Sequence, residues 1–174
     1  MAFSRAKKVW DEAALYEYAI GALGRRMRSV AELKRLMRQR LGGAENAEAL
    51  MDAVITRLKD QHYLNDTQYA ATYSSLRRDN QKFGRMRVVS DLKSRGVHPD
   101  VIEKTVAGAY AGVNEEKLAR QYLRRKRLQK PADARQAARI FRALVRAGFG
   151  TKTIISILKK WDVEDEVISA LEEE

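Results

Sequence analysis

The residues of this sequence best suited to chemistry are arginines and lysines, which gather in four groups. An arginine guanidinium binds a phosphate or a carboxylate through two parallel hydrogen bonds, whereas a lysine ammonium acts as a point charge. Such groups on successive elements would form a stripe suited to a phosphate backbone or to a row of carboxylates, although any single member can be ordinary surface charge. The groups are Arg25, Arg26 and Arg28; Lys34, Arg35, Arg38 and Arg40; Arg77, Arg78, Lys82, Arg85 and Arg87; and Arg120, Arg124, Arg125, Lys126, Arg127 and Lys130.

The residue types that catalysis or metal binding needs are missing from the sequence or lie far apart in it. There is no cysteine, and the two histidines, His62 and His98, belong to distant segments, so no zinc site is expected. The sequence also lacks a phosphate-binding G-x-x-x-x-G-K-[ST] loop and a G-x-S-x-G nucleophile turn. We therefore predict a binding protein that is not an enzyme and carries neither metal nor cofactor.

The charge of the chain is strong and uneven. The net charge is +11, but the last thirteen residues hold seven acidic residues and no basic one, so the first 161 residues carry +18. A basic body favours a polyanionic partner, either nucleic acid or an acidic protein surface. The acidic end is expected to be a solvated helix face, or alternatively a competitor of nucleic acid for the basic surface.

No apolar run approaches the ~18 residues of a membrane span, and no signal-peptide pattern opens the sequence. A cytoplasmic protein without membrane contact is therefore expected.

The elements that must position the basic groups are predicted to be helices, because a helical phrase recurs. Residues 83–102 (FGRMRVVSDLKSRGVHPDVI) and 149–168 (FGTKTIISILKKWDVEDEVI) are identical at eight positions. In each copy the apolar residues mark one helical face, a tight turn and a second helical face. A weaker third copy lies 55 positions upstream, where Leu33 matches Val88. The phrase is therefore predicted to be the structural unit, with both helices packed on one core.

Local signals predict where several helices begin and which tyrosines are buried. Residues 29–32 (SVAE) form a capping box, and Asn65 is a weaker cap. Helices are also expected to begin after His98 and after Gly150. Tyr63, Tyr69 and Tyr73 have rings that could stack on bases, but Tyr69 and Tyr73 stand one helical turn apart and are expected to face the core.

These observations predict an all-α fold, an elongated tandem array of three three-helix modules with an extra or extended helix before the third. The modules are residues 1–64, 65–112 and 131–174, and a basic connecting helix occupies 113–130. A three-helix unit also resembles a helix-turn-helix, but the would-be recognition helices begin with acidic residues, Asp100 and Glu103 in the second module and EDEV in the third. Acidic residues repel phosphates, so sequence-specific reading of DNA by these helices is not expected.

Three phrases in order resemble the RecX family, bacterial regulators of the RecA recombinase. They are L-x-R-R-x-x-S-x-x-E-L from Leu23 to Leu33, HYLNDTQYA at 62–70, and FGRMRVVSDLKSRGV at 83–97. The resemblance covers residues 12–110 well and 140–168 moderately. The family usually has glycine in place of His62, aspartate in place of Asn65, phenylalanine in place of Tyr69 and often arginine in place of Ala147.

The resemblance implies tandem three-helix modules, in agreement with the repeat, and a cytoplasmic partner, the helical RecA–DNA filament. It implies binding along the filament groove, inhibition of strand exchange and ATP hydrolysis or capping of the filament, and thereby control of homologous recombination and the SOS response. DNA, single- or double-stranded, would be contacted directly or through the filament, and a monomer is the expected state. The interaction candidates are Arg25, Arg26, Arg28, Arg77, Arg78, Arg85, Arg87, Lys93 and Arg95.

Two other interpretations stay open from the sequence alone. One is a helical protein that binds DNA without sequence preference through its charge, and the other is a helical scaffold for a different protein, in which the basic groups are incidental. The first would bind DNA without RecA and with a steep salt dependence.

Overall fold

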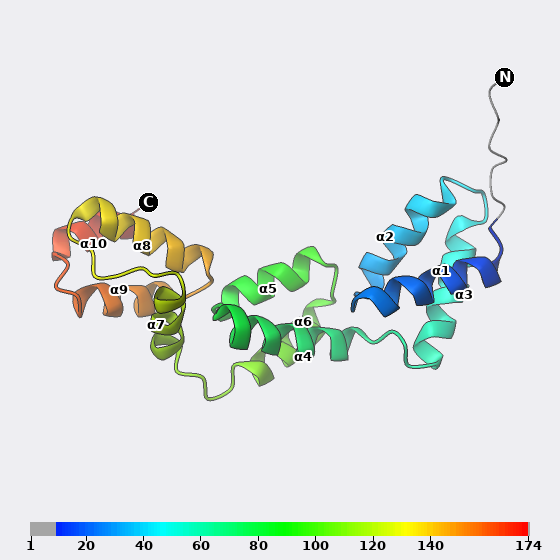
Figure 1. Ribbon diagram of the computed structural model, residues 1–174, viewed down its shortest axis with the longest axis horizontal. Coiled ribbons are helices and arrows are strands. Elements are labelled where there is room, and N and C mark those ends of the chain that lie inside the picture. The colour runs from blue at the N-terminus through cyan, green and yellow to red at the C-terminus, as the bar shows by residue number, and fades with distance from the viewer. Residues whose placement is uncertain (1–9, 174) are drawn as a thin grey trace, which may run out of the picture. The chain divides into compact units, whose positions relative to one another are not determined.

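The computed structural model describes residues 10–173, which are all-helical and contain no strand within that range (Figure 1), so the predicted fold class is confirmed. The predicted outer boundaries of the first and third modules, residues 1 and 174, lie outside the described residues. The helices are α1 (Glu12–Arg25), α2 (Val30–Leu41), α3 (Ala47–Asp60), α4 (Asp66–Leu76) with a π-helical turn at Arg77–Gln81, α5 (Arg85–Ser94), α6 (Pro99–Ala109), α7 (Glu115–Arg125), α8 (Ala134–Arg146), α9 (Thr151–Lys159) and α10 (Asp165–Glu172).

The chain forms two compact units. The first runs to Tyr69 and includes Arg95–Val97, and the second holds Ala70–Ser94 and the chain from His98 onward. In the first unit α1, α2 and α3 lie against one another (Figure 1). Their buried apolar faces share one core, which includes Leu15, Ala19, Leu33, Met37, Met51 and Leu58.

The start of α2 follows the sequence signal. The Ser29 side chain accepts a hydrogen bond from the Glu32 amide at 3.1 Å, and the Glu32 carboxylate accepts one from the Ser29 amide at 3.2 Å. Both bonds satisfy amides that the first helical turn leaves without partners. The capping box is thus confirmed, and so is the weaker cap, since the Asn65 side chain accepts from the Gln68 amide at 3.0 Å.

In the second unit α5 and α6 pack together and bury the residues that the repeat predicted, among them Val88, Leu92 and Ile102. The equivalent residues of the second copy, Ile154, Leu158 and Ile168, are buried in the core of α7–α10. The turn after the first helix of each copy holds a left-handed residue at the same position, Gly96 with φ +73° and Asp162 with φ +57°. The repeated sequence therefore builds a repeated local structure.

The basic helix before the third module is a core element. Leu118, Ala119, Tyr122 and Leu123 of α7 are buried with apolar residues of α8, α9 and α10. This arrangement leaves the basic residues near its C-terminal end, Arg124 to Arg127, exposed. The division into modules at residues 64, 112 and 130 remains a proposal, because compactness divides the chain differently.

Tyr69 and Tyr73 of α4 were both predicted to face the core, and the structure confirms this in full only for Tyr69. Tyr69 is buried, whereas Tyr73 is half-buried and its hydroxyl donates to Asp91 at 3.0 Å. Leu76, one turn further on, is exposed. The helix widens into a π-helical turn directly after Leu76, which changes the face that the residues after it present.

Candidate nucleic-acid and protein interface

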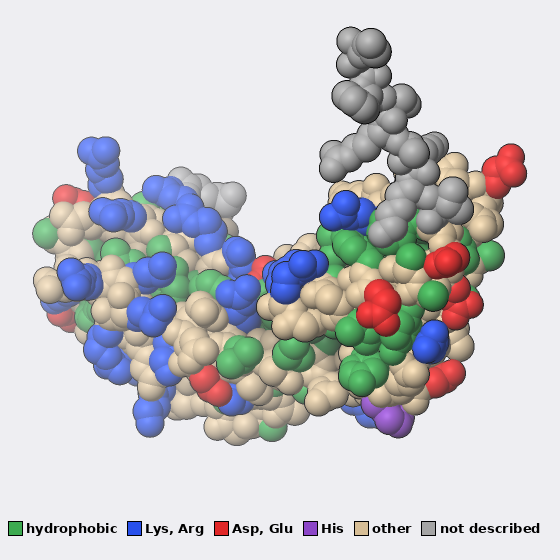
Figure 2. Space-filling view, turned by 45° about the vertical axis from the view of Figure 1, so that its right-hand side comes forward, with side chains coloured by type: hydrophobic (Ala, Val, Ile, Leu, Met, Phe, Trp, Pro, Cys, Tyr) green, Lys and Arg blue, Asp and Glu red, His purple; other side chains and the backbone are tan. Residues whose placement is uncertain are grey.

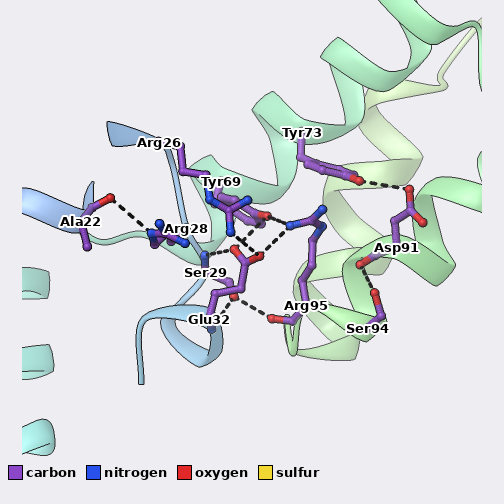
Figure 3. A network of polar contacts seen from close by, with 10 residues as sticks. All are labelled: Ala22, Arg26, Arg28, Ser29, Glu32, Tyr69, Tyr73, Asp91, Ser94 and Arg95. Atoms are coloured by element: carbon purple, nitrogen blue, oxygen red, sulfur yellow. Dashed lines mark hydrogen bonds and ion pairs between the residues drawn. The ribbon is translucent and has the colours of Figure 1, made fainter. Parts of the chain in front are cut away.

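Two of the candidate arginines, Arg26 and Arg95, contact a buried carboxylate in the first unit (Figure 3). Glu32, whose side chain is 10% exposed, lies 2.6 Å from the Arg95 guanidinium and 3.6 Å from that of Arg26. The Tyr69 hydroxyl donates to Glu32 at 3.3 Å and accepts from Arg95 at 3.2 Å. Burial raises the pKa of the Tyr69 phenol, and the nearby Glu32 charge raises it further.

This network gives Arg95 an internal role. Its guanidinium is three-quarters buried on Glu32, and its carbonyl oxygen accepts from the Ser29 hydroxyl at 2.6 Å. The neighbouring Gly96 is equally constrained, since a Cβ there would lie 2.4 Å from the Ala31 side chain. Truncating one partner of such a buried charge pair leaves the other charge uncompensated. Arg95 therefore stabilises the first unit, while Arg26 keeps more than half of its side chain in solvent.

Arg25, Arg26 and Arg28 follow one another at the end of α1, and their charges repel. The pKa of Arg28 is lowered, first by partial burial and then by the positive charge of Arg26. Its Nε donates to the Ala22 carbonyl at 3.2 Å, which anchors the guanidinium against α1. Arg25 and Arg26 are exposed. The structure thus brings three of the predicted arginines together where an anion would relieve their repulsion.

The second group of candidates lies around the turn at Phe83 and Gly84 in the second unit. Arg77 lies 4.7 Å from the centre of the Tyr73 ring. Arg87 contacts Asp91 at 3.0 Å and lies 5.6 Å from the centre of the Phe83 ring.

The Arg78 side chain in the same group binds a carboxylate and a backbone carbonyl. It pairs with Asp79 at 2.8 Å and donates to the Ala109 carbonyl. The hydrogen bond to Asp79 raises the pKa of Arg78 and lowers that of the carboxyl. Arg85 and Lys93 are exposed. The candidates of this unit therefore divide into three kinds. Arg78 is largely committed to the fold and Arg77 is half-buried. The exposed candidates are Arg85, Arg87 and Lys93.

A close backbone crossing fixes the turn that carries Arg85 and Arg87. The Gly84 amide donates to the Ala147 carbonyl at 2.8 Å, and the Met86 amide donates to the Gly148 carbonyl at 3.1 Å. A Cβ on Gly84 would lie 2.2 Å from the Gly148 oxygen, so only glycine fits there. The crossing joins the two copies of the repeated phrase through the residues at their starts.

A row of arginines on α8 was not among the predicted interaction candidates. Arg135, Arg139, Arg142 and Arg146 recur at intervals of four, three and four residues, so they share one helix face, and all four are exposed. The helix contains no acidic residue. The buried residues Ala137, Ile140, Phe141 and Leu144 occupy the opposite face. The signal was visible in the sequence as a periodic arginine pattern, but no family-like phrase drew attention to it.

Figure 2 shows Lys and Arg side chains crowded over the left-hand part of the molecule, which holds α7–α10. The basic residues at the end of α7 and the arginines of α8 are exposed in the second unit. Acidic residues pair with some of the basic side chains of this unit. Glu116 binds Lys160 and Arg120, whose hydrogen bonds lower its pKa in that order, and Asp162 binds Lys130 at 2.7 Å.

No three His, Cys, Asp or Glu side chains among residues 10–173 gather as a metal would require. No helix in this range has the length and apolar character to cross a bilayer.

Comparison with known proteins identifies relatives along most of the chain. A family model described as "RecX, second three-helix domain" matches residues 65–106. The protein named "Regulatory protein RecX" of Leptothrix cholodnii is 33% identical over 146 residues, which cover 84% of this chain and 88% of that protein. The protein of the same name in Chromobacterium violaceum is 30% identical over 120 residues, which cover 69% of this chain and 75% of that protein.

Two solved structures share the fold. The crystal structure of RecX from Lactobacillus salivarius matches 87% of this chain and 96% of its own, with a TM-score of 0.66 and 19% identity. A second crystal structure, of a regulatory protein RecX, matches 86% of this chain and 73% of its own, with a TM-score of 0.71 and 16% identity.

Proposed function

This chain belongs to the RecX family of regulatory proteins, and we propose that it regulates the RecA recombinase by binding the RecA–DNA filament in its groove. The observation that carries the proposal is the family membership together with exposed basic groups in both units. The chain acts by binding, as a monomer and without catalysis, and it inhibits strand exchange and ATP hydrolysis. By this route it restrains homologous recombination and the SOS response.

The structure supports a partner with many regularly spaced anionic groups. The α8 arginine row extends over the twelve residues 135–146, about 16 Å of helix. One strand of B-form DNA carries a phosphate about every 3.4 Å along the axis, so the row is long enough to meet more than one phosphate. A filament repeats its surface, and a protein that meets it at several points gains avidity from contacts that are individually weak.

The test is RecA ATPase activity on single-stranded DNA, with the protein titrated in at two salt concentrations. Inhibition at well below one protein per RecA, persisting at moderate salt, is expected. Absence of inhibition at both salt concentrations would refute the proposal.

The predicted surface at the end of α1 is tested by Arg25→Ala/Arg26→Ala. Both residues are exposed, so helix content should be unchanged and inhibition weakened. Lys104→Ala/Lys117→Ala is the matched control, because it removes the same charge from exposed positions outside the four basic groups. Full inhibition by the arginine variant would place the interaction surface elsewhere.

A second candidate function, DNA binding through charge alone, is favoured by the α8 row. On this alternative, inhibition appears only near the amount that coats the DNA and vanishes with added salt, because each neutralised phosphate releases counterions. The same titration therefore separates the two functions.

A further inference from the structure

A cavity of about 210 Å³ in the first unit is lined by apolar, aromatic and amide side chains together with a basic one. It lies between the residues that follow α1 and those that precede and begin α4. Its wall combines Met27 and Tyr63, which are apolar or aromatic, with Asn65 and Gln68, which are amides, and with Arg28. None of the residues that line it is acidic.

Tyr63 supplies an aromatic ring that the core does not use. The side chain is 61% exposed, and Met27 beside the same cavity is 48% exposed. A single exposed apolar side chain is ordinary, but two large ones on the wall of one cavity form a surface for a flat apolar partner. The next residue, Leu64, is buried and anchors this segment in the core of the first unit.

Backbone hydrogen bonds fix the position of the residue that carries this ring. The amides of Tyr63 and Leu64 both donate to the Leu58 carbonyl, at 2.9 and 3.3 Å, which closes the end of α3. His62, where the family resemblance places glycine, adopts φ +60°, the left-handed conformation that ends a helix in this way. The exposed ring is thus carried by an ordered helix end, so little conformational entropy is lost when it stacks.

The polar groups of the cavity suit the edge of a base. The Asn65 oxygen accepts from the Gln68 amide at 3.0 Å, which directs the Asn65 side-chain NH₂ away from the helix. The Gln68 side chain is exposed and offers both donors and an acceptor. Amide side chains of this kind pair with the donor and acceptor groups on base edges.

The positive charge lies beside the cavity. The Nε of Arg28 is bound to the Ala22 carbonyl, and the guanidinium carries further N–H donors for an anion. Arg25 and Arg26 precede it, and their repulsion lowers the pKa of Arg28 after the effect of burial. A phosphate next to a bound base would lie beside the Arg28 guanidinium.

We propose that this cavity binds one unstacked nucleobase of a single strand, with Tyr63 stacked on the base, Asn65 and Gln68 at its edge, and Arg28 on an adjacent phosphate. The proposal deepens the proposed function, since it rests on the chain meeting DNA, and it specifies the form of DNA. A base inside a duplex is stacked and paired, and extruding it costs a few kcal/mol. The cavity therefore selects single strands over duplex.

The test measures fluorescence anisotropy of a labelled thymidine 20-mer without RecA, for wild type, Tyr63→Ala and Tyr63→Phe. One stacked base contributes about 1–3 kcal/mol, so the Ala variant should bind about 5- to 150-fold more weakly. The Phe variant, which keeps a ring, should bind like wild type. Affinity for a duplex of equal length should be the same in all three proteins, and an abasic strand should bind wild type as weakly as the 20-mer binds the Ala variant.

Met86→Ala is the control, because Met86 is a large exposed apolar side chain in the second unit; it should leave single-strand affinity unchanged. The proposal is overturned if Tyr63→Ala binds the 20-mer like wild type, or if it loses duplex affinity to the same extent. If the Ala variant keeps its DNA affinity and loses RecA inhibition, the cavity binds protein and the proposal is wrong.

RecA ATPase measured on the same proteins separates this proposal from the proposed function. Unchanged 20-mer affinity with full RecA inhibition in Tyr63→Ala overturns the base site alone. Ring-dependent binding of the 20-mer by a wild-type protein that leaves RecA unaffected overturns the proposed function alone.

Discussion

Replacing Gly148 by alanine is expected to destabilise the second unit severely. Gly148 has φ +88°, and a Cβ there would lie 2.1 Å from the Arg87 amide nitrogen and 2.5 Å from the Arg87 Cβ. These are backbone and near-backbone atoms, so the clash cannot be relieved by rotating a flexible side chain. The two chain segments must move apart, and that movement stretches the hydrogen bonds which Gly84 and Met86 donate across the crossing.

The magnitude follows from these contacts. Holding an alanine in the left-handed region costs about 1–2 kcal/mol, and each of the two backbone hydrogen bonds contributes about 0.5–1.5 kcal/mol net. The free energy of unfolding of the second unit should therefore fall by about 2–5 kcal/mol. Gly108→Ala is the control in the same unit, because a Cβ at this position in α6 meets nothing within 4 Å. It should be neutral or stabilising by up to about 1 kcal/mol.

The two tryptophans make the measurement specific, because Trp10 lies in the first unit and Trp161 in the second. In a Trp10→Phe background, urea unfolding followed by fluorescence reports on Trp161 and hence on the second unit. Gly148→Ala should lower the urea midpoint well below that of Gly108→Ala. Equal midpoints for the two variants would show that the backbone crossing does not exist as described.

Three further outcomes are expected. Arg135→Ala/Arg139→Ala should reduce the slope of log K against log salt by about 1.8 on duplex DNA and about 1.4 on single strands, measured by anisotropy. Burial raises the pKa of the Asp66 carboxyl, so wild-type stability should decline as the pH rises from about 3.9 through the raised value. Asp66→Asn removes this decline and should therefore gain stability relative to wild type across that pH window. Urea titrations at several pH values measure the difference. Tyr110→Phe removes a 2.7 Å hydrogen bond to the Phe83 carbonyl and should cost about 1 kcal/mol in the same titrations.

Each of these outcomes can fail. For the salt slopes Lys104→Ala/Lys117→Ala is the charge-matched control, and an equal change in slope would mean that the α8 row has no special contact with phosphate. A constant stability difference between Asp66→Asn and wild type over the whole pH range would exclude a raised pKa at Asp66. Unchanged stability of Tyr110→Phe would mean that the hydroxyl exchanges its partner for water without loss.

The local elements were predictable because their signals are local. The capping box needs only Ser29 and Glu32, three residues apart, and both of its hydrogen bonds form. The core faces needed only periodicity, and Val88 and Leu92 are buried together with their counterparts Ile154 and Leu158. Hydrophobic spacing within one or two helical turns decides which face of a helix is covered.

The role of Arg95 was not predictable, because its partner is distant in sequence. Arg95 and Glu32 are 63 residues apart, and their buried ion pair is visible only in the fold. The sequence offered Arg95 as an interaction residue because it lies in a family-like phrase. The α8 row failed to attract notice for the opposite reason, since its regular spacing falls outside the phrases that carried the resemblance.

This difference between committed and exposed arginines bears on how the protein binds. A guanidinium that already neutralises a buried carboxylate, as Arg95 does, gains little from a second anion and leaves an unpaired charge if it moves. Exposed arginines, as on α8, can approach a phosphate without leaving a buried carboxylate, and they release its counterions. Binding energy should therefore come from exposed rows and from rings such as Tyr63. Variants of Arg95 should lose stability before they lose affinity.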